Sequence, residues 1–265
     1  MRKRFAGGVL LVALVCLAVS ALAAEFPVKV TGIGVEGLVK IHKKDVLDAV
    51  GFKVGDEVTE SDLKAASQAI YDLGWFSEVV PRVDGGNIVF RLTENPVVRK
   101  IEIKGNVNKK PYELFGIKLF ELPIMSTYKI RQILRQDGVK KREVLNRNSL
   151  ETALKDVISE YNKRGYVLVT VGDVATGETL SIEFVEELIA GNRVEGLETV
   201  PVSVAEEMID LPLNEPLQQS GLQRVLLRLR ESVYFSDVNV VPKAGPQANS
   251  VILDWDLTCL LYTSP

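Results

Sequence analysis

Residues 149–171 read SLETALKDVISEYNKRGYVLVTV, and this stretch decides the fold. Six apolar residues recur at helical spacing and form one stripe: Leu150, Ala153, Leu154, Val157, Ile158 and Tyr161. Ser149 is the expected N-cap. Gly165 stands where a residue in the left-handed conformation would end the helix. From Tyr166 the apolar period changes to two, which predicts a strand to Val171.

The same helix, turn and strand occur twice more. Gly165 aligns with Gly74 and with Val233, and the next residue in each copy is aromatic: Tyr166, Trp75 and Tyr234. Upstream, each copy opens with a short strand that ends in a glycine: Gly37, Gly105 and Gly196. The spacing is 37 positions in the first and third copies and 60 in the second, which carries 23 extra residues. Because a β-branched residue cannot take the left-handed conformation readily, the turn at Val233 must differ.

Each copy predicts the order β-α-α-β-β. In the first copy the expected elements are one strand over 28–35, helices over 43–50 and 59–73, and hairpin strands over 75–83 and 88–93. The second copy has a first helix at 127–136 and a hairpin turn at 175–178, and the third turns at 244–249. The fold class is therefore α+β, with tandem modules that each contain a three-stranded sheet covered on one face by two helices.

The repeats also set the domain boundaries. We call the copies module 1 (25–95), module 2 (96–188) and module 3 (189–258). The extra residues of module 2, at about 109–125, are unusually apolar, and the candidate partner patch within them is Leu114, Phe115, Leu119 and Phe120. Two interpretations stay open: the insertion packs on its own module or a neighbour, or it is an exposed surface for a partner.

Both ends of the chain differ from the modules. Residues 1–24 have a basic start, a short apolar core and Ala21-Leu22-Ala23, which together predict a cleaved secretory signal peptide. Residues 259–265 break the repeat pattern. We expect them to be a non-native tail on a truncated chain.

Composition excludes several classes of function. Without residues 1–24 the chain has 29 Lys and Arg against 35 Asp and Glu, a net charge of −6, which argues against nucleic-acid binding. One histidine, His42, and one remaining cysteine, Cys259, cannot form a metal site or an internal disulfide. No nucleotide-binding or hydrolase motif is present. The acidic pair Glu186-Glu187 is expected to be solvated. The sequence predicts no enzyme, no metal and no cofactor.

The repeated pattern resembles the polypeptide-transport-associated (POTRA) domains of the outer-membrane barrel-assembly (BamA-like) family. The segments that carry the resemblance are the strand 101–106, the helix ends at 71–76 and 161–166, and the closing strands at 88–94 and 182–186. The resemblance covers about residues 27–258. The 23-residue insertion and the missing membrane barrel depart from the family pattern.

The resemblance implies a periplasmic arm, at the outer membrane of a diderm bacterium, that aids folding and insertion of β-barrel proteins. Its implied partners are unfolded outer-membrane β-barrel proteins, lipoprotein subunits of the assembly complex, and the outer membrane itself through the missing C-terminal barrel. In this family the strand after the second helix is a sheet edge, which an extended client segment can join. The implied client-binding residues are Glu78, Val79, Val80, Val167, Leu168, Val169, Thr170, Val171, Asp237, Val238, Asn239 and Val240.

Two alternatives remain. The modules could belong to a two-partner-secretion or translocation-assembly transporter, which only the missing C-terminal region would distinguish. They could also form a periplasmic scaffold that docks partners, although a cleavable signal at Ala21-Leu22-Ala23 speaks against a membrane-anchored scaffold.

Overall fold

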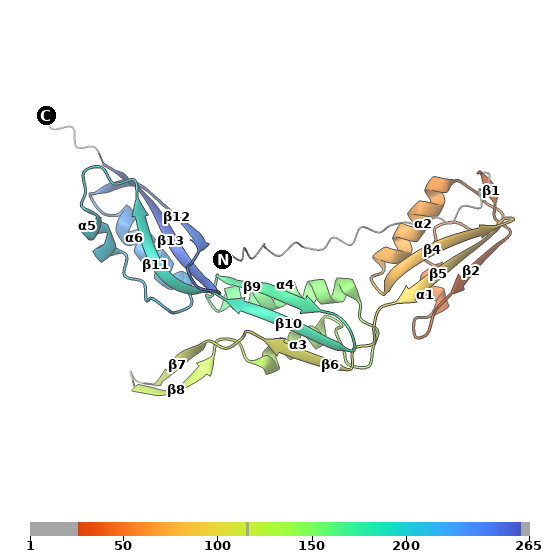
Figure 1. Ribbon diagram of the computed structural model, residues 1–265, viewed down its shortest axis with the longest axis horizontal. Coiled ribbons are helices and arrows are strands. Elements are labelled where there is room, and N and C mark those ends of the chain that lie inside the picture. The colour runs from red at the N-terminus through yellow and green to blue at the C-terminus, as the bar shows by residue number, and fades with distance from the viewer. Residues whose placement is uncertain (1–25, 115–116, 261–265) are drawn as a thin grey trace, which may run out of the picture. The chain divides into compact units, whose positions relative to one another are not determined.

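The computed structural model describes residues 26–114 and 117–260. The expected signal peptide and most of the expected tail lie outside these residues. The chain forms two compact units, one ending at Asn95 and the other beginning at Pro96 (Figure 1). The second unit contains both module 2 and module 3.

Module 1 is built around a three-stranded sheet. Its elements are β1 (Val28–Lys29), β2 (Gly32–Glu36), α1 (Lys43–Leu47), β3 (Glu57–Val58), α2 (Glu60–Asp72), β4 (Phe76–Asp84) and β5 (Asn87–Glu94). The strand order is β2-β5-β4, with β5 parallel to β2 and antiparallel to β4. The single strand expected over 28–35 is wrong: β1 pairs with β3 instead. The chain passes from the small β1-β3 sheet to the three-stranded sheet at Val30 and Thr31. The N–H of Val30 donates to the carbonyl of Asp56, and the N–H of Thr31 donates to the carbonyl of Gly86.

Modules 2 and 3 repeat the same plan (Figure 1). Module 2 contains β6 (Lys100–Lys104), β7 (Lys109–Leu114), β8 (Ile117–Pro123), α3 (Thr127–Gln136), α4 (Arg147–Lys163), β9 (Val169–Ala175) and β10 (Thr179–Glu186). Module 3 contains β11 (Leu188–Glu195), α5 (Val202–Met208), α6 (Gln219–Arg230), β12 (Phe235–Ala244) and β13 (Ser250–Cys259). Their strand orders are β6-β10-β9 and β11-β13-β12, and the insertion forms the separate hairpin β7-β8. The predicted α+β fold class is confirmed.

Some boundaries differ from the sequence prediction. The N-cap of α4 is Asn146, whose side chain accepts from the N–H of Ser149, so the helix begins earlier than expected. Gly165 does end it in the left-handed conformation, with φ +87°. Cys259 is the last residue of β13 and is buried, so it belongs to the fold of module 3 rather than to a tail.

Each module has its own apolar core. An aromatic residue follows the aligned position in every copy, and we expect it to anchor the edge strand to the helices. In module 2 this residue, Tyr166, is buried. In module 1 Trp75 is half-buried against the core and Phe76 is fully buried, whereas in module 3 the expected residue is wrong: Phe235 is buried and Tyr234 is 43% exposed. Both phenylalanines are the first residue of their strand, and the segment between the second helix and this strand is shorter in modules 1 and 3 (residues 73–75 and 231–234) than in module 2 (residues 164–168).

The glycines that end the first strand of each module lie against the central strand. Gly37, Gly105 and Gly196 all have positive φ, between +79° and +88°. A Cβ at Gly105 would lie 1.8 Å from the carbonyl oxygen of Phe184, and one at Gly37 would lie 2.0 Å from that of Leu92. The equivalent approach at Gly196, to the carbonyl of Leu257, is 2.8 Å. Only a residue without a Cβ allows this contact.

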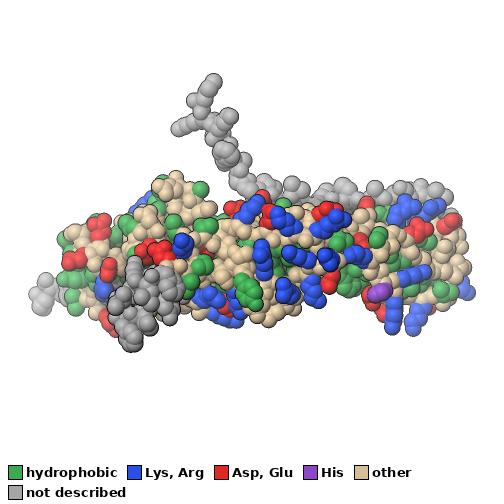
Figure 2. All heavy atoms as spheres, turned by 90° about the horizontal axis from the view of Figure 1, so that it is seen from below, with side chains coloured by type: hydrophobic (Ala, Val, Ile, Leu, Met, Phe, Trp, Pro, Cys, Tyr) green, Lys and Arg blue, Asp and Glu red, His purple; other side chains and the backbone are tan. Residues whose placement is uncertain are grey.

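Charge is divided unevenly among the modules. Residues 96–188 carry 16 Lys and Arg against 13 Asp and Glu, a net charge of +3, whereas residues 25–95 and 189–258 carry −4 and −5. Figure 2 shows Lys and Arg side chains gathered over the middle of the face in view, which is formed by module 2.

Two glycine substitutions distinguish the stability cost of the steric clash with the central strand from the cost of the left-handed backbone conformation. Gly165 has a positive φ but nothing near its missing Cβ, so Gly165→Ala should cost about 1–2 kcal/mol. Gly105→Ala adds a clash with the backbone of Phe184 and should cost about 3 kcal/mol or more. Native-state hydrogen exchange of the β10 amides measures both. Equal losses of protection would show that the contact with Phe184 is unimportant.

Candidate functional site

The strand after the second helix is a sheet edge in every module, namely β4, β9 and β12. The structure places Glu78, Val79 and Val80 in β4, Val169, Thr170 and Val171 in β9, and the range 237–240 in β12. Val167 and Leu168 were expected in the edge strand but precede it, and Leu168 packs against the core of module 3.

The register of β9 determines which of its backbone groups are available. Leu168 accepts from the N–H of Glu187, and Thr170 is paired with Val185. Because backbone hydrogen-bonding directions alternate along an antiparallel pair, the N–H and C=O groups of Val169 and Val171 point away from β10. A further strand beside β9 would meet these groups.

A groove runs between this edge and α4. Its volume is about 370 Å³, and it is lined by Glu151, Leu154, Lys155, Ile158, Ser159, Asn162 and Val171. Leu154, Ile158 and Val171 are half-buried and pack against the module 2 core from outside. Glu151 and Lys155 form an ion pair of 2.6 Å in the same groove. The groove therefore offers apolar side chains directly beside the unpaired backbone of β9.

The edges of the other two modules are blunted. β4 contains Pro81, opposite Phe90, and β12 contains Pro242, opposite Leu253. Proline has no N–H to donate, so each strand lacks one of the donors that an added strand would need. β9 contains no proline, although a bulge at Gly172 and Asp173 interrupts its pairing with β10. Its open edge is therefore the segment 169–171, next to the groove.

Glu186, at the end of β10, joins three elements beneath this edge. It is 4% exposed and accepts from the hydroxyl of Tyr161 at 2.7 Å and from the N–H of Asn108 at 2.9 Å. Tyr161 is in the last turn of α4, and Asn108 immediately precedes β7. Burial raises the pKa of Glu186 although these groups donate to it, and burial and Glu186 together raise the pKa of Tyr161.

Our expectation that Glu186 is solvated is wrong. The signal that locates it correctly is the alternation along β10, where Leu180, Ile182 and Phe184 are all fully buried. Glu186 continues this two-residue period and so points to the same side as the core.

The position of Glu186 recurs in the other modules as Glu94 and Cys259. Each lies two residues beyond the carbonyl that approaches the strand-ending glycine, and each accepts from N–H groups of the loop that follows that glycine. In module 1 burial alone would raise the pKa of Glu94, but the N–H groups of Ile41, Val39 and Lys40 lower it overall. In module 3 the loop N–H groups, with that of Thr199 foremost, lower the pKa of Cys259 to about 7.

The apolar insertion is only partly described. Strand β7 ends at Leu114, and strand β8 contains Leu119 and Phe120. Phe115 lies outside the described residues. The residues that close the insertion, Ile124 and Met125, are buried in the module 2 core. A partner patch on the hairpin stays a prediction.

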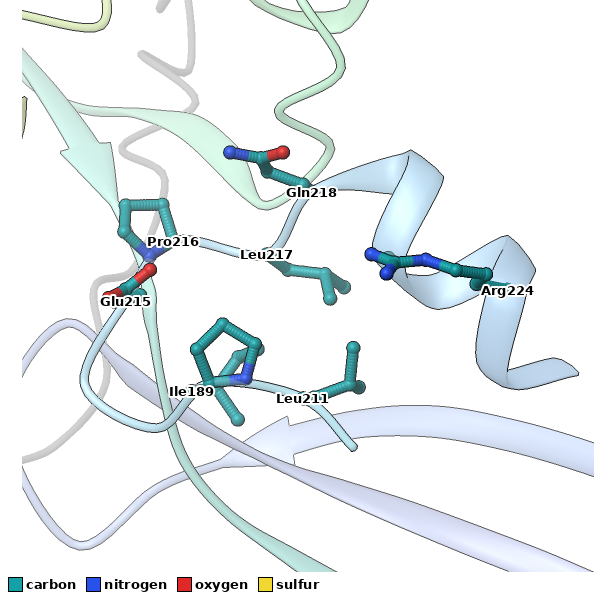
Figure 3. Close-up of a pocket in the computed structure, with 9 residues that line it drawn as sticks. Ile189, Leu211, Glu215, Pro216, Leu217, Gln218 and Arg224 are labelled. Carbon is teal, nitrogen blue, oxygen red and sulfur yellow. The ribbon is translucent and has the colours of Figure 1, made fainter. Parts of the chain in front are cut away.

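Modules 2 and 3 share a junction with direct backbone contacts. The N–H of Gln219, at the start of α6, donates to the carbonyl of Gly165, at the end of α4, at 2.7 Å. Gln218 bridges to Tyr166 in the same place. Beside it, Figure 3 shows Ile189, Leu211 and Leu217 with the polar ends of Glu215, Gln218 and Arg224 around a pocket of about 130 Å³.

Residues 26–114 and 117–260 contain no group of three or more His, Cys, Asp or Glu side chains placed to hold a metal ion. No helix in these residues has both the length and the apolar character needed to cross a membrane.

Known proteins share this arrangement. Residues 28–95 match the family model described as POTRA, surface antigen variable number repeat. POTRA1-3 of the periplasmic domain of Omp85 from Anabaena superposes with a TM-score of 0.62 at 19% identity, over 89% of this chain and 96% of that one. The N-terminal domain of Omp85 from Thermosynechococcus elongatus gives 0.61 at 21% identity, over 88% and 98%. Residues 28–95 thus match the POTRA model, and the chain shares the fold of tandem POTRA modules.

Sequence comparison gives more specific relatives. The chain is 27% identical over 192 residues to the outer membrane protein assembly factor BamA of Neisseria meningitidis, which covers 69% of this chain and 22% of that protein. It is 25% identical over 83 residues to BamA of Buchnera aphidicola, over 31% of this chain and 14% of that protein. The chain is thus similar to part of BamA and spans less than a quarter of the length of these relatives.

The pKa of Glu94 should lie below the usual value for a glutamate side chain, and the pKa of Glu186 should lie above it. Carboxyl ¹³C shifts followed by NMR should give a midpoint below 4.5 for Glu94 and above 4.5 for Glu186. By linkage, Glu94 contributes stability above its unfolded pKa that is lost as pH falls through its folded pKa. Glu186 contributes stability below its unfolded pKa that is lost as pH rises through its folded pKa. Coincident midpoints would contradict the difference in burial.

Proposed function

We propose that this chain is the periplasmic arm of an outer-membrane protein assembly factor. In this proposal it receives extended segments of unfolded β-barrel proteins and holds them by strand addition while they are folded and inserted. Similarity to BamA and to the periplasmic POTRA modules of Omp85 supports this class of function. The chain acts through binding, without a chemical step or a cofactor.

The observation that carries the proposal is the edge of β9 beside the α4 groove. Val169 and Val171 offer outward N–H and C=O groups, and the groove offers apolar side chains to alternate residues of a client. Backbone pairing tolerates any client sequence, whereas the groove favours segments with apolar residues at every second position. Barrel strands alternate in this way.

Of the three edges predicted to bind clients, we infer that β9 is the principal one. The prolines at positions 81 and 242 remove a donor from β4 and β12, and proline is one of the features by which sheet edges avoid further pairing. Module 2 is then the client-binding module, and the edges of modules 1 and 3 contribute less.

Binding at this edge is expected to be weak and reversible. Each added backbone hydrogen bond contributes about 0.5–1.5 kcal/mol net, and ordering an extended client opposes this gain. The bulge at Gly172 and Asp173 also limits the open edge to a few residues. Weak binding suits a protein that must release its client to the membrane.

Two proline substitutions on neighbouring residues test the mechanism. Val171→Pro removes an outward N–H and leaves the hydrogen bonds to β10 intact, so it should weaken client binding about tenfold with little change in thermal stability. Thr170→Pro removes an inward N–H and should lower the thermal stability of module 2 instead. The measurement is an NMR titration with a synthetic peptide of alternating apolar and polar residues.

The titration also locates the site. Shift changes on β9 and along the α4 groove, lost in Val171→Pro, are the expected result. If the changes fall on the β7-β8 hairpin, or if Val171→Pro binds as well as the unmodified protein, strand addition at β9 is wrong.

A further inference from the structure

The exposed side of α3 and the turn after it form a second polar surface on module 2. We define the basic face by Tyr128, Lys129, Arg131 and Arg135 on α3, with Lys140, Lys141 and Arg142 in the turn. All except the half-buried Lys129 are exposed, and Tyr128 is 80% exposed.

Helix geometry explains why these side chains share one side. Ile130, Ile133 and Leu134 are buried and hold α3 against the module 2 core. Arg131 and Arg135 are four residues apart on the opposite side, so their side chains start about 6 Å from each other. Like charges at this spacing disfavour an isolated helix. The cost is only about 0.2–0.5 kcal/mol, and burial of the apolar side of α3 offsets it, so the pair persists and keeps two positive charges close together.

Within the described residues, no carboxylate neutralises Arg131 and Arg135. On α2 and α4, Lys64 and Lys155 pair with glutamates one turn earlier at 2.6 Å. α3 contains no acidic residue, and within the described residues Arg131, Arg135, Lys140 and Lys141 have no carboxylate within 4.0 Å. Asp137, at the end of α3, has one buried carboxylate oxygen, and the exposed Glu143 follows Arg142 in the turn.

We propose that the basic face binds a partner protein through an acidic, carboxylate-rich surface. Arginine binds carboxylates in a two-pronged geometry, and exposed tyrosine with arginine is the composition of protein interfaces. A surface that inserts into a membrane needs several exposed apolar side chains, whereas the apolar residues of α3 are buried. The exposed tyrosine, the carboxylate-binding geometry of arginine and the lack of exposed apolar residues on α3 therefore favour a protein over a lipid surface on this face.

The basic face is separate from the proposed client edge. Arg131 donates to the carbonyl of Ile101 in β6, which places α3 on the β6 side of the sheet. β6 and β9 are the opposite edges of the order β6-β10-β9. Module 2 can therefore hold an acidic partner and an extended client at the same time, and the two proposals can fail independently.

A charge-reversal experiment tests this inference. The probe is a fluorescent peptide of alternating glutamate and serine, titrated with the protein at low and at physiological salt. Arg131→Glu/Arg135→Glu should weaken binding at least about tenfold, and added salt should weaken binding to the unmodified protein. The matched control is Lys43→Glu/Lys44→Glu, which makes the same charge change on exposed residues of α1 and should stay within about twofold.

Three outcomes would overturn the proposal. An equal loss of peptide affinity in both double variants would show that the net charge of the protein, and not the basic face, attracts the peptide. Binding only to vesicles of equal parts phosphatidylglycerol and phosphatidylcholine, without peptide binding, would assign the face to lipid. Salt-sensitive self-association abolished by Arg131→Glu/Arg135→Glu would make the acidic modules of a second copy the occupant. A circular dichroism spectrum and melting temperature unchanged from those of the unmodified protein show that the α3 variant is folded.

Discussion

Each module depends on one close approach, between the glycine that ends its first strand and a carbonyl of its central strand. The approach lets the chain turn away from the sheet toward the helices without a side chain in the way. Two residues further along the central strand, an acceptor side chain takes the N–H groups of the loop that has just turned. The first two modules use the carboxylates Glu94 and Glu186, and the third uses the thiol of Cys259. One backbone contact and one acceptor thus set the path of the chain in all three copies.

The repeated frame leaves the edge strands free to differ. Pro81 and Pro242 close two edges to further pairing, and the absence of proline leaves β9 open beside its groove. Charge differs in the same way, because module 2 is positive between two negative neighbours. The middle copy therefore combines the proposed client edge, the basic face and the inserted hairpin, while the outer copies supply similar frames with fewer binding features.

The repeat could be predicted from sequence because helical spacing and glycine punctuation are local signals. The sequence could not decide which of two nearby residues takes a given structural position. Asn146 rather than Ser149 caps α4, since both residue types suit that position. Phe76 is fully buried whereas Trp75 packs only partly against the core, because β4 begins at Phe76. Leu154 belongs to the predicted stripe but lies at the edge of the core, so the groove appears only once β9 is in place.

The hydrogen bond from Gln219 to the carbonyl of Gly165 has a consequence for how such chains arise and fold. The end of one helix provides the cap for the start of another that lies in the next repeat. A gene rearrangement that separated modules 2 and 3 would leave both helix ends without this partner, so the pair should be inherited as one piece. During synthesis the earlier helix emerges first, and its terminal carbonyl is ready when the later helix forms. Assembly across this junction then proceeds from the N-terminus toward the C-terminus.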